Sequence, residues 1–304
     1  MALFIVGKKI FYQLSPDVFD MLVLHTFELG LLKPHMMKNC LTLICSLLIF
    51  ITVHAQNKDL FEKQLFVVGE DTLPCRILTP QNFQIGKKYP LVIFLHGAGE
   101  RGSDNNAQLQ WGSDLFLDSL NRTKYPAIVV FPQCPANDKW AEYNKNPNAD
   151  STGYVYSNDA PIRKSLKLVS QFIDTLLSSG QIDKSRVYVG GLSMGGFGTY
   201  ELLWRRPQTF AAAFPICGAM NPSRVKDFRK NLPLWIFHGD KDPIIFVANS
   251  RLISNLSKKT NPNVKYTEYP GVGHDSWINA FKEPTLFPWL FSQRLNPTKQ
   301  SKIN

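Results

Sequence analysis

The segment from Val187 to Phe197, Val-Tyr-Val-Gly-Gly-Leu-Ser-Met-Gly-Gly-Phe, constrains the fold of this chain more than any other. Its β-branched and aromatic start predicts a short buried strand, and residues 195–204 carry apolar side chains at helical spacing. Ser193 falls on the turn between them, with a glycine two positions before it and another two positions after it, where tight backbone excludes larger residues. The segment therefore predicts a serine at the end of a strand, and the N-terminal amides of the following helix are directed toward a ligand bound at that serine.

Other apolar runs of strand length alternate with helical patterns along the chain. Strands are predicted at residues 64–68, 75–78, 91–95, 127–131, 187–189, 210–216, 234–237 and 264–269. Apolar residues recur at helical spacing in 159–179, where Asp159 or Ser157 is available as the N-terminal cap, and 246–256 has the pattern of a further helix. Strands that alternate with helices predict an α/β fold, in which a doubly wound, mostly parallel sheet is covered by helices on both faces of a single domain.

A serine hydroxyl is a weak nucleophile near neutral pH, so it needs a base within hydrogen-bond reach and an acid that orients the base. Beyond residue 55 the chain has three histidines. His96 and His238 each stand directly between a strand and a glycine, whereas His274 lies in a glycine-flanked loop after the last strand. A histidine between a strand and a turn usually holds the loop by hydrogen bonds. We therefore predict that His274 is the base for Ser193.

A nucleophilic serine on a strand-to-helix turn, the arrangement called a nucleophile elbow, implies the chain order serine, acid, histidine. Two aspartates fit that order, since Asp240 and Asp242 both follow the next-to-last predicted strand. Asp242 is the preferred acid because it lies deeper in the loop and precedes Pro243, and Asp240 is interpreted as a turn former. Asp275 is disfavoured, because the side chain of an immediate neighbour does not readily reach round to orient the ring of His274.

Two loops complete the predicted site. Three glycines follow a central strand in the loop His96 to Gly102, so the amides of Ala98 and Met194 are expected to donate to a developing oxyanion. The long polar loop 132–158 stands at the end of the next strand, where doubly wound folds bind ligands, and its Trp140 is the expected substrate contact. A packed surface loop anchored by Trp140 is the alternative. The glycine-rich loop lacks the Lys-Ser/Thr pair of a phosphate-binding loop, and we expect neither a metal nor a cofactor.

These motifs resemble the α/β-hydrolase superfamily, and the similarity extends over residues 60–295. Within the superfamily, the chain is similar to secreted bacterial esterases of the predicted-peptidase, polyhydroxybutyrate-depolymerase and feruloyl-esterase-like group. Four runs carry this similarity: 96–102, 191–196 (Gly-Leu-Ser-Met-Gly-Gly), 238–243 (His-Gly-Asp-Lys-Asp-Pro) and 273–277 (Gly-His-Asp-Ser-Trp). The resemblance implies a triad of Ser193, Asp242 and His274, with the oxyanion held by the amides of Ala98 and Met194.

On this resemblance we expect a secreted serine hydrolase that cleaves carboxylic esters through an acyl-enzyme. Its expected substrates are small-molecule esters or acyl groups on plant polysaccharides. A serine peptidase of the prolyl-oligopeptidase type, whose catalytic domain has the same fold, is the alternative. A non-catalytic carbohydrate-binding relative is a second alternative, which the complete set of catalytic residue types disfavours.

The first 55 residues have a different pattern from the rest. Met37-Lys38-Asn39, the apolar run 40–53 and the small residue Ala55 have the order of a secretory signal peptide, and the run is short for a membrane span. We interpret residues 1–36 as an upstream extension, 37–55 as the signal peptide, 56–297 as the catalytic domain and 298–304 as a basic tail. This predicts a secreted or periplasmic protein with no stable membrane span after cleavage. A genuine leader segment with an internal membrane anchor is the alternative.

Charge and cysteines argue against two further classes of function. The formal net charge is +10, but the basic residues are scattered and form no basic helix or aromatic-basic motif, so we expect no nucleic-acid partner. After cleavage at Ala55 three cysteines remain, Cys75, Cys134 and Cys217, which leaves at least one of them unpaired. None of the three lies on a strand-to-helix turn like that of Ser193, so each is interpreted as a small buried side chain rather than as a nucleophile.

Overall fold

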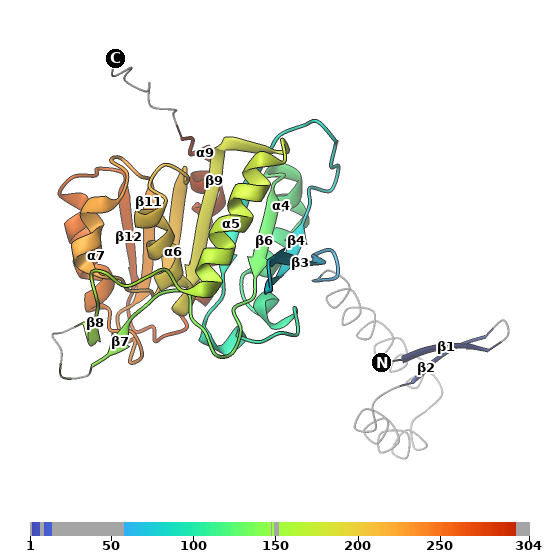
Figure 1. Ribbon diagram of the computed structural model, residues 1–304, viewed down its shortest axis with the longest axis horizontal. Helices are drawn as coiled ribbons and strands as arrows, with labels where there is room; N and C mark the ends of the chain where they lie inside the picture. Colours follow the sequence, from blue (N-terminus) through green and yellow to red (C-terminus); the bar gives the residue numbers. More distant parts are fainter. Residues whose placement is uncertain (1, 7–8, 14–57, 147, 149–151, 296–304) are drawn as a thin grey trace, which may run out of the picture. The chain divides into compact units, whose positions relative to one another are not determined.

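The computed structural model describes residues 2–6, 9–13, 58–146, 148 and 152–295 (Figure 1). Contacts divide the chain into two units, Met1–Asn57 and Lys58–Asn304. Within the first unit, β1 (Ala2–Val6) and β2 (Lys9–Gln13) pair antiparallel. The predicted signal peptide at 37–55 and the predicted basic tail at 298–304 lie outside the described residues. Among the helices of the described ranges, none combines the length and the apolar character that a membrane span requires.

The second unit is built on an eight-stranded sheet with the strand order β12-β11-β10-β9-β5-β6-β4-β3. Its strands are β3 (Glu62–Val68), β4 (Asp71–Leu78), β5 (Tyr89–Leu95), β6 (Ile128–Pro132), β9 (Ile182–Leu192), β10 (Ala212–Ile216), β11 (Leu234–Gly239) and β12 (Val264–Tyr269). The six strands from β12 to β6 in this order run parallel, and β4 and β3 pair antiparallel at one edge. The predicted mostly parallel α/β sheet is therefore confirmed.

Helices cover both faces of this sheet. The longer ones, α5 (Lys164–Ser178), α6 (Met194–Arg205) and α7 (Ala248–Lys258), lie in front of the sheet in Figure 1, and α9 (Leu286–Ser292) lies behind it. The short helices are α3 (Ser113–Leu117), α4 (Ser119–Lys124), α8 (Trp277–Ala280) and the 3-10 helices η1 (Ala98–Glu100), η2 (Ala107–Leu109) and η3 (Pro222–Asp227). A separate pair of short strands, β7 (Asn144–Lys145) and β8 (Tyr154–Val155), lies in the connection from β6 to α5.

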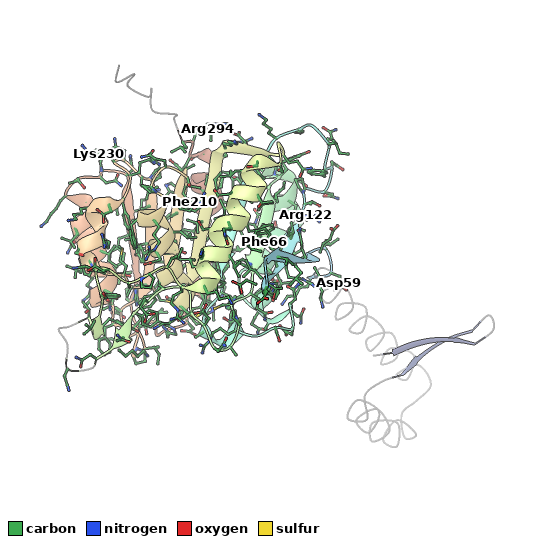
Figure 2. All side chains as sticks on the ribbon, viewed as in Figure 1. Asp59, Phe66, Arg122, Phe210, Lys230 and Arg294 are labelled. Atoms are coloured by element: carbon green, nitrogen blue, oxygen red, sulfur yellow. The ribbon has the colours of Figure 1, made fainter. Side chains whose placement is uncertain are left out.

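The central strand β5 shows why the sheet is buried on both sides. Residues 91, 93 and 95 belong to the apolar cluster that includes α5 and α6, whereas residues 92 and 94 belong to the cluster that includes α3 and α9. All residues of β5 are buried, which accounts for its unbroken apolar sequence. Toward the sheet edge, Phe66 of β3 packs against Phe172 of α5, with ring centroids 4.8 Å apart (Figure 2).

The helix predicted over 159–179 is present as α5, but its N-terminal cap differs from the prediction. The carboxylate of Asp138, in the loop after β6, accepts hydrogen bonds at Oδ2 from the amide (2.9 Å) and the hydroxyl (2.6 Å) of Ser165. The expectation that Asp159 or Ser157 caps this helix is therefore wrong. The capping residue is 27 positions away in sequence, so only the folded chain brings it to the helix.

Asp183, at the start of β9, makes the stability of the fold depend on pH. Its Oδ1 accepts hydrogen bonds from the amide and the hydroxyl of Ser185 (3.0 and 2.6 Å), and its Oδ2 accepts one from Arg186 Nε (2.6 Å). Partial burial favours the neutral acid, but these bonds outweigh it and lower the pKa of Asp183 to about 2. A carboxyl whose pKa is lowered by folding stabilises the protein above its unfolded pKa of about 4, and that contribution is lost as pH falls through the folded pKa.

We expect Asp183→Asn to lower the free energy of unfolding at neutral pH by about 1 kcal/mol, after allowance for solvent screening at this partly exposed site. The difference from the unsubstituted protein should shrink as pH falls below about 4. Urea unfolding at a series of pH values measures both quantities. Glu62→Gln on the exposed edge strand is the matched control and should change stability little at any pH. A difference that persisted undiminished at low pH would contradict the assignment.

Candidate active site

Ser193 lies between β9 and α6 in a conformation that residues other than glycine rarely adopt, with φ 53° and ψ −118°. Backbone hydrogen bonds hold this turn. The Ser193 amide donates to the Ile216 carbonyl of β10 (2.9 Å), and the amides of Gly196 and Phe197 donate to the Ser193 carbonyl (2.8 and 3.2 Å). Such strain at a strand-to-helix turn is typical of a nucleophile elbow, which presents the serine hydroxyl to a substrate.

The glycines on either side of Ser193 are required by the close approach of neighbouring backbone. A Cβ atom built on Gly191 would lie 2.4 Å from the Gly195 carbonyl oxygen. A Cβ atom built on Gly195 would lie 1.9 Å from the Leu95 carbonyl oxygen at the end of β5. Because these neighbours are backbone atoms rather than flexible side chains, they have little freedom to move aside, and any larger residue at position 195 would push β5 and α6 apart.

Gly195→Ala is therefore expected to destabilise the protein by about 3 kcal/mol or more, the upper range for overpacking a buried position. For a domain of this size that loss corresponds to a fall in Tm of roughly 6–12 °C. Thermal unfolding measures the effect, and Gly99→Ala is the control, because a Cβ atom there would have no neighbour within 4 Å. Equal Tm values for the two variants would show that the elbow is less tightly packed than the structure indicates.

The structure brings the three predicted catalytic side chains into one chain of hydrogen bonds. Ser193 Oγ lies 2.8 Å from His274 Nε2, and His274 Nδ1 lies 2.7 Å from Asp242 Oδ2. The three residues follow β9, β12 and β11, whose carboxyl ends meet at the same edge of the parallel sheet. Asp240 lies apart from them and accepts a hydrogen bond at Oδ1 from the Gly271 amide (2.6 Å), as a turn former does.

Asp242 is buried but is held as an anion by the groups around it. Oδ1 accepts hydrogen bonds from the amides of Ile244 (2.8 Å) and Ile245 (2.9 Å). Burial alone would raise the pKa of this carboxyl, but hydrogen bonds from His238, His274 and the Ile245 amide outweigh burial and hold the pKa of Asp242 well below its usual range. A carboxylate that stays ionised can orient a neutral His274 ring and stabilise the imidazolium that forms when the ring takes a proton.

His96 has the structural role that its position after a strand predicts. It is buried, its Nδ1 donates to the Gly97 carbonyl (2.6 Å), and its Nε2 accepts from the Cys134 amide (3.0 Å). Burial lowers the pKa of His96 to about 4, so the ring is neutral and its tautomer is set by these two partners. The ring ties the loop after β5 to the loop after β6.

The two predicted oxyanion donors flank the serine. A Cβ atom built on Gly97 would lie 3.7 Å from Ser193 Cβ, so the backbone that leads into Ala98 packs directly against the elbow. Met194 is the first residue of α6, where an amide has no acceptor within the helix. The sequence reasoning missed one support of this loop: Arg101 Nε donates to the Ala98 carbonyl (3.0 Å), which fixes the turn from the side.

Trp140 does not line the site. Its side chain has no exposed surface, its Nε1 donates to the His96 carbonyl (3.0 Å), and a Cβ atom on Gly198 of α6 would lie 2.5 Å from Trp140 Cβ. A fully buried side chain offers no surface to a substrate, so the structure argues against the expected substrate contact. It favours the alternative of a loop anchored by Trp140, because the indole fills the space that Gly198 leaves between α6 and this loop.

Two other tryptophans, which sequence reasoning did not select, lie beside the base. The Trp277 ring meets the His274 ring edge to face at 5.4 Å, and the Trp111 ring lies 5.8 Å from that of Trp277. Both are half-buried, and Trp111 also lines an open pocket of about 460 Å³ together with Ile278 and Phe281. The signal for Trp277 was present in the sequence, since it stands three positions after His274, and in the structure it begins α8 directly after the loop that carries His274.

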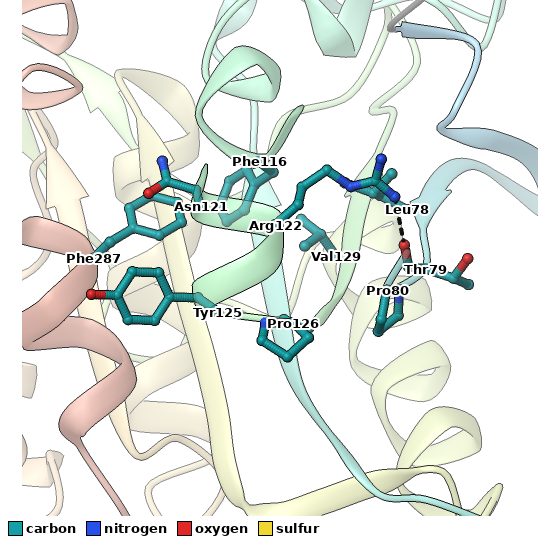
Figure 3. Close-up of a pocket in the computed structure, with 11 residues that line it drawn as sticks. Leu78, Thr79, Pro80, Phe116, Asn121, Arg122, Tyr125, Pro126, Val129 and Phe287 are labelled. Carbon is teal, nitrogen blue, oxygen red and sulfur yellow. Dashed lines mark hydrogen bonds between the residues drawn. The ribbon is translucent and has the colours of Figure 1, made fainter. Parts of the chain in front are cut away.

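A second pocket lies at the opposite edge of the sheet, where β6 begins (Figure 3). Phe116, Tyr125 and Phe287 line it, and Arg122 donates to the Thr79 carbonyl across it (3.3 Å). Its free space is about 10 Å³, room for no more than a single water molecule. The predicted catalytic residues are not among its lining residues, so we place no substrate there.

Comparisons with known proteins identify a family and relatives named as esterases. Residues 83–286 match the family model described as Phospholipase/Carboxylesterase. Lysophospholipase-like protein 1 from Mus musculus is 25% identical over 232 residues, 73% of this chain and 92% of the relative. A bifunctional acetylxylan esterase/xylanase from Neocallimastix patriciarum is 33% identical over 169 residues, 56% of this chain and 21% of the relative. A solved structure described as a thermostable esterase is 35% identical, with a TM-score of 0.70, over 79% of this chain and 64% of that one.

Proposed function

The chain belongs to the phospholipase/carboxylesterase family of the α/β-hydrolase superfamily, and from this premise we propose that it hydrolyses carboxylic esters through a triad of Ser193, His274 and Asp242. The observation that carries the proposal is the continuous chain of hydrogen bonds, 2.8 Å from Ser193 Oγ to His274 Nε2 and 2.7 Å from His274 Nδ1 to Asp242 Oδ2. These distances are within the reach required of a nucleophile, its base and the group that orients the base.

The reaction follows from these contacts. His274 Nε2 takes the hydroxyl proton as Ser193 Oγ attacks the ester carbonyl carbon, and the amides of Ala98 and Met194 donate to the oxyanion that forms. When the tetrahedral intermediate collapses, the C–O bond to the alcohol breaks and His274 returns the proton to the departing alcohol. The same base then activates a water molecule, which attacks the acyl-enzyme, releases the acid and restores the Ser193 hydroxyl.

The proposed substrates are esters whose acyl groups are carried by plant polysaccharides, and the proposed location is outside the cytoplasm. Similarity to a protein named for acetylxylan esterase activity supports the first part, although it spans a small share of that protein. The tryptophan pair Trp111 and Trp277 beside His274 offers flat apolar faces, which suit a sugar ring or an aromatic acyl group. The signal-peptide pattern at 37–55 supports export.

A comparison of ester and amide cleavage tests the proposed function. Initial rates of the purified protein are measured on an acetylated xylo-oligosaccharide, a feruloylated sugar ester and a matched peptide amide, with Ser193→Ala as the control for serine dependence. We expect serine-dependent ester turnover and little amide cleavage. Amide cleavage at a comparable rate would instead assign the triad to a peptidase, and turnover of simple esters without turnover of the sugar esters would overturn the substrate proposal alone.

A further inference from the structure

A second histidine lies against the acid of the proposed triad. His238, near the end of β11, is fully buried, and its Nε2 lies 3.1 Å from Asp242 Oδ2, the same oxygen that His274 contacts. We infer that His238 is a positioning residue for ester hydrolysis, which fixes the Asp242 carboxylate so that it aims His274 at Ser193. This inference rests on the proposed function and adds a fourth side chain to the three that the sequence predicts.

The partners of His238 determine where its proton lies. Nε2 faces two acceptors, Asp242 Oδ2 and the Ile245 carbonyl oxygen (2.8 Å), so Nε2 must carry the proton. Nδ1 lies 2.7 Å from Ser250 Oγ on α7, and a hydroxyl can donate to the unprotonated nitrogen. Both His238 and Ser250 are fully buried, so water does not compete for either bond. His238 therefore acts as a fixed donor rather than as a second base.

The arrangement leaves the Asp242 carboxylate no freedom to turn. Its Oδ1 is held by the amides of Ile244 and Ile245, and its Oδ2 is shared by the rings of His274 and His238. By donating to the Ile245 carbonyl as well, His238 also closes the loop that supplies those amides. Without the His238 donor, a buried anion would lose one of its four hydrogen bonds, and Oδ2 would have only His274 to hold it.

The contrast with His96 shows that this is more than the usual role of a histidine at a strand end. His96 and His238 stand at equivalent places, each followed by glycine, and both are buried. The hydrogen bonds of the His96 ring go to backbone groups, the Gly97 carbonyl and the Cys134 amide. The His238 ring instead donates to a charged side chain, and that side chain contacts the proposed base.

Three substitutions of His238 test the inference. The side-chain amide nitrogen of His238→Gln can take the place of Nε2 and donate to Asp242, whereas that of His238→Asn corresponds to Nδ1 and faces Ser250. His238→Leu removes both groups at similar volume. We expect kcat on the ester substrate, expressed per site titrated with a fluorophosphonate, to fall roughly 10- to 100-fold in the Leu and Asn variants, with KM within about threefold of the parent. The Gln variant should recover most of the lost kcat.

The outcomes separate a positioning role from a structural one. A purely structural role would lower the number of titratable sites and Tm while leaving kcat per site unchanged, and this result for Leu or Asn would overturn the inference. If the Leu variant does not fold, the pair of Gln and Asn variants decides, and equal kcat values for that pair would also overturn it. Failure of the proposed function is recognised separately. If Ser193 is not the nucleophile, Ser193→Ala retains activity and the parent protein does not label with the fluorophosphonate, and if the triad is that of a peptidase, the parent protein cleaves the matched amide at a comparable rate.

Discussion

Ser193→Ala is expected to lower kcat on an ester substrate by about six orders of magnitude, because the residues of such a triad act as a unit and lose almost all of their effect together. The substitution removes the hydroxyl that lies 2.8 Å from His274 Nε2, while the backbone and its amides stay in place. Residual turnover would come from the oxyanion donors and from substrate binding. Initial rates measured with enough protein to detect a millionfold loss test the prediction.

The control for this loss is Ser119→Ala, the same chemical change at an exposed position near the start of α4, which should leave kcat unaltered. The tight turn around Ser193 tolerates alanine, since Cβ is already present in serine, so Tm of the Ser193 variant should change little. A purified Ser193→Ala protein that kept more than about one part in a thousand of the parent kcat would place the nucleophile elsewhere.

The fold could be predicted because its strongest determinants are local. Unbroken apolar runs of strand length require cover on both faces, and β5 is buried along its whole length as that pattern predicts. The elbow follows from Gly191 and Gly195, because a side chain at either position would meet neighbouring backbone. The family match and the similarity to esterases confirm the predicted superfamily and the class of ester hydrolase.

The contacts that the sequence reasoning missed join loops far apart in the chain. Asp138 caps α5 from the loop after β6, and Trp140 of the same loop fills the space beside Gly198. In the sequence both residues belong to a polar stretch with aromatic residues, which is equally typical of a binding loop and of a packed one. The choice depends on whether α6 offers a gap of the right size, and the residues of the loop do not contain that information.

His96 and His238 show the same limit within one pattern. Each follows a strand and precedes a glycine, and the sequence reasoning gave both the same interpretation. The loop after β11 then folds back so that Asp242 meets His238, whereas the ring of His96 bonds to the backbone of Gly97 and Cys134. His96 and His238 therefore differ in their contacts because the loops after the two strands fold differently, and the histidine and glycine at each strand end do not distinguish them.

Asp242→Asn is expected to lower kcat by about four orders of magnitude. The Asp242 carboxylate is the acceptor in each of its hydrogen bonds: Oδ1 accepts from two amides, and Oδ2 accepts from the rings of His238 and His274. An asparagine must place an NH₂ group at one of these oxygen positions, where it would face two N–H groups. The way to relieve this conflict at Oδ2 is for His274 to turn its unprotonated nitrogen toward the amide, which leaves Nε2 protonated and unable to take the proton of Ser193.

Asp240→Asn provides the matched control, since it makes the same change two positions earlier in the same loop. Asp240 accepts at Oδ1 from the Gly271 amide, and asparagine keeps that acceptor, so kcat should stay within about threefold of the parent. A loss in the Asp240 variant as large as in the Asp242 variant would mean that both substitutions act by disturbing the loop. A large loss confined to Asp242, with Tm preserved, would assign the effect to the lost contact with His274, where the carboxylate both sets the tautomer of the ring and stabilises the imidazolium that forms.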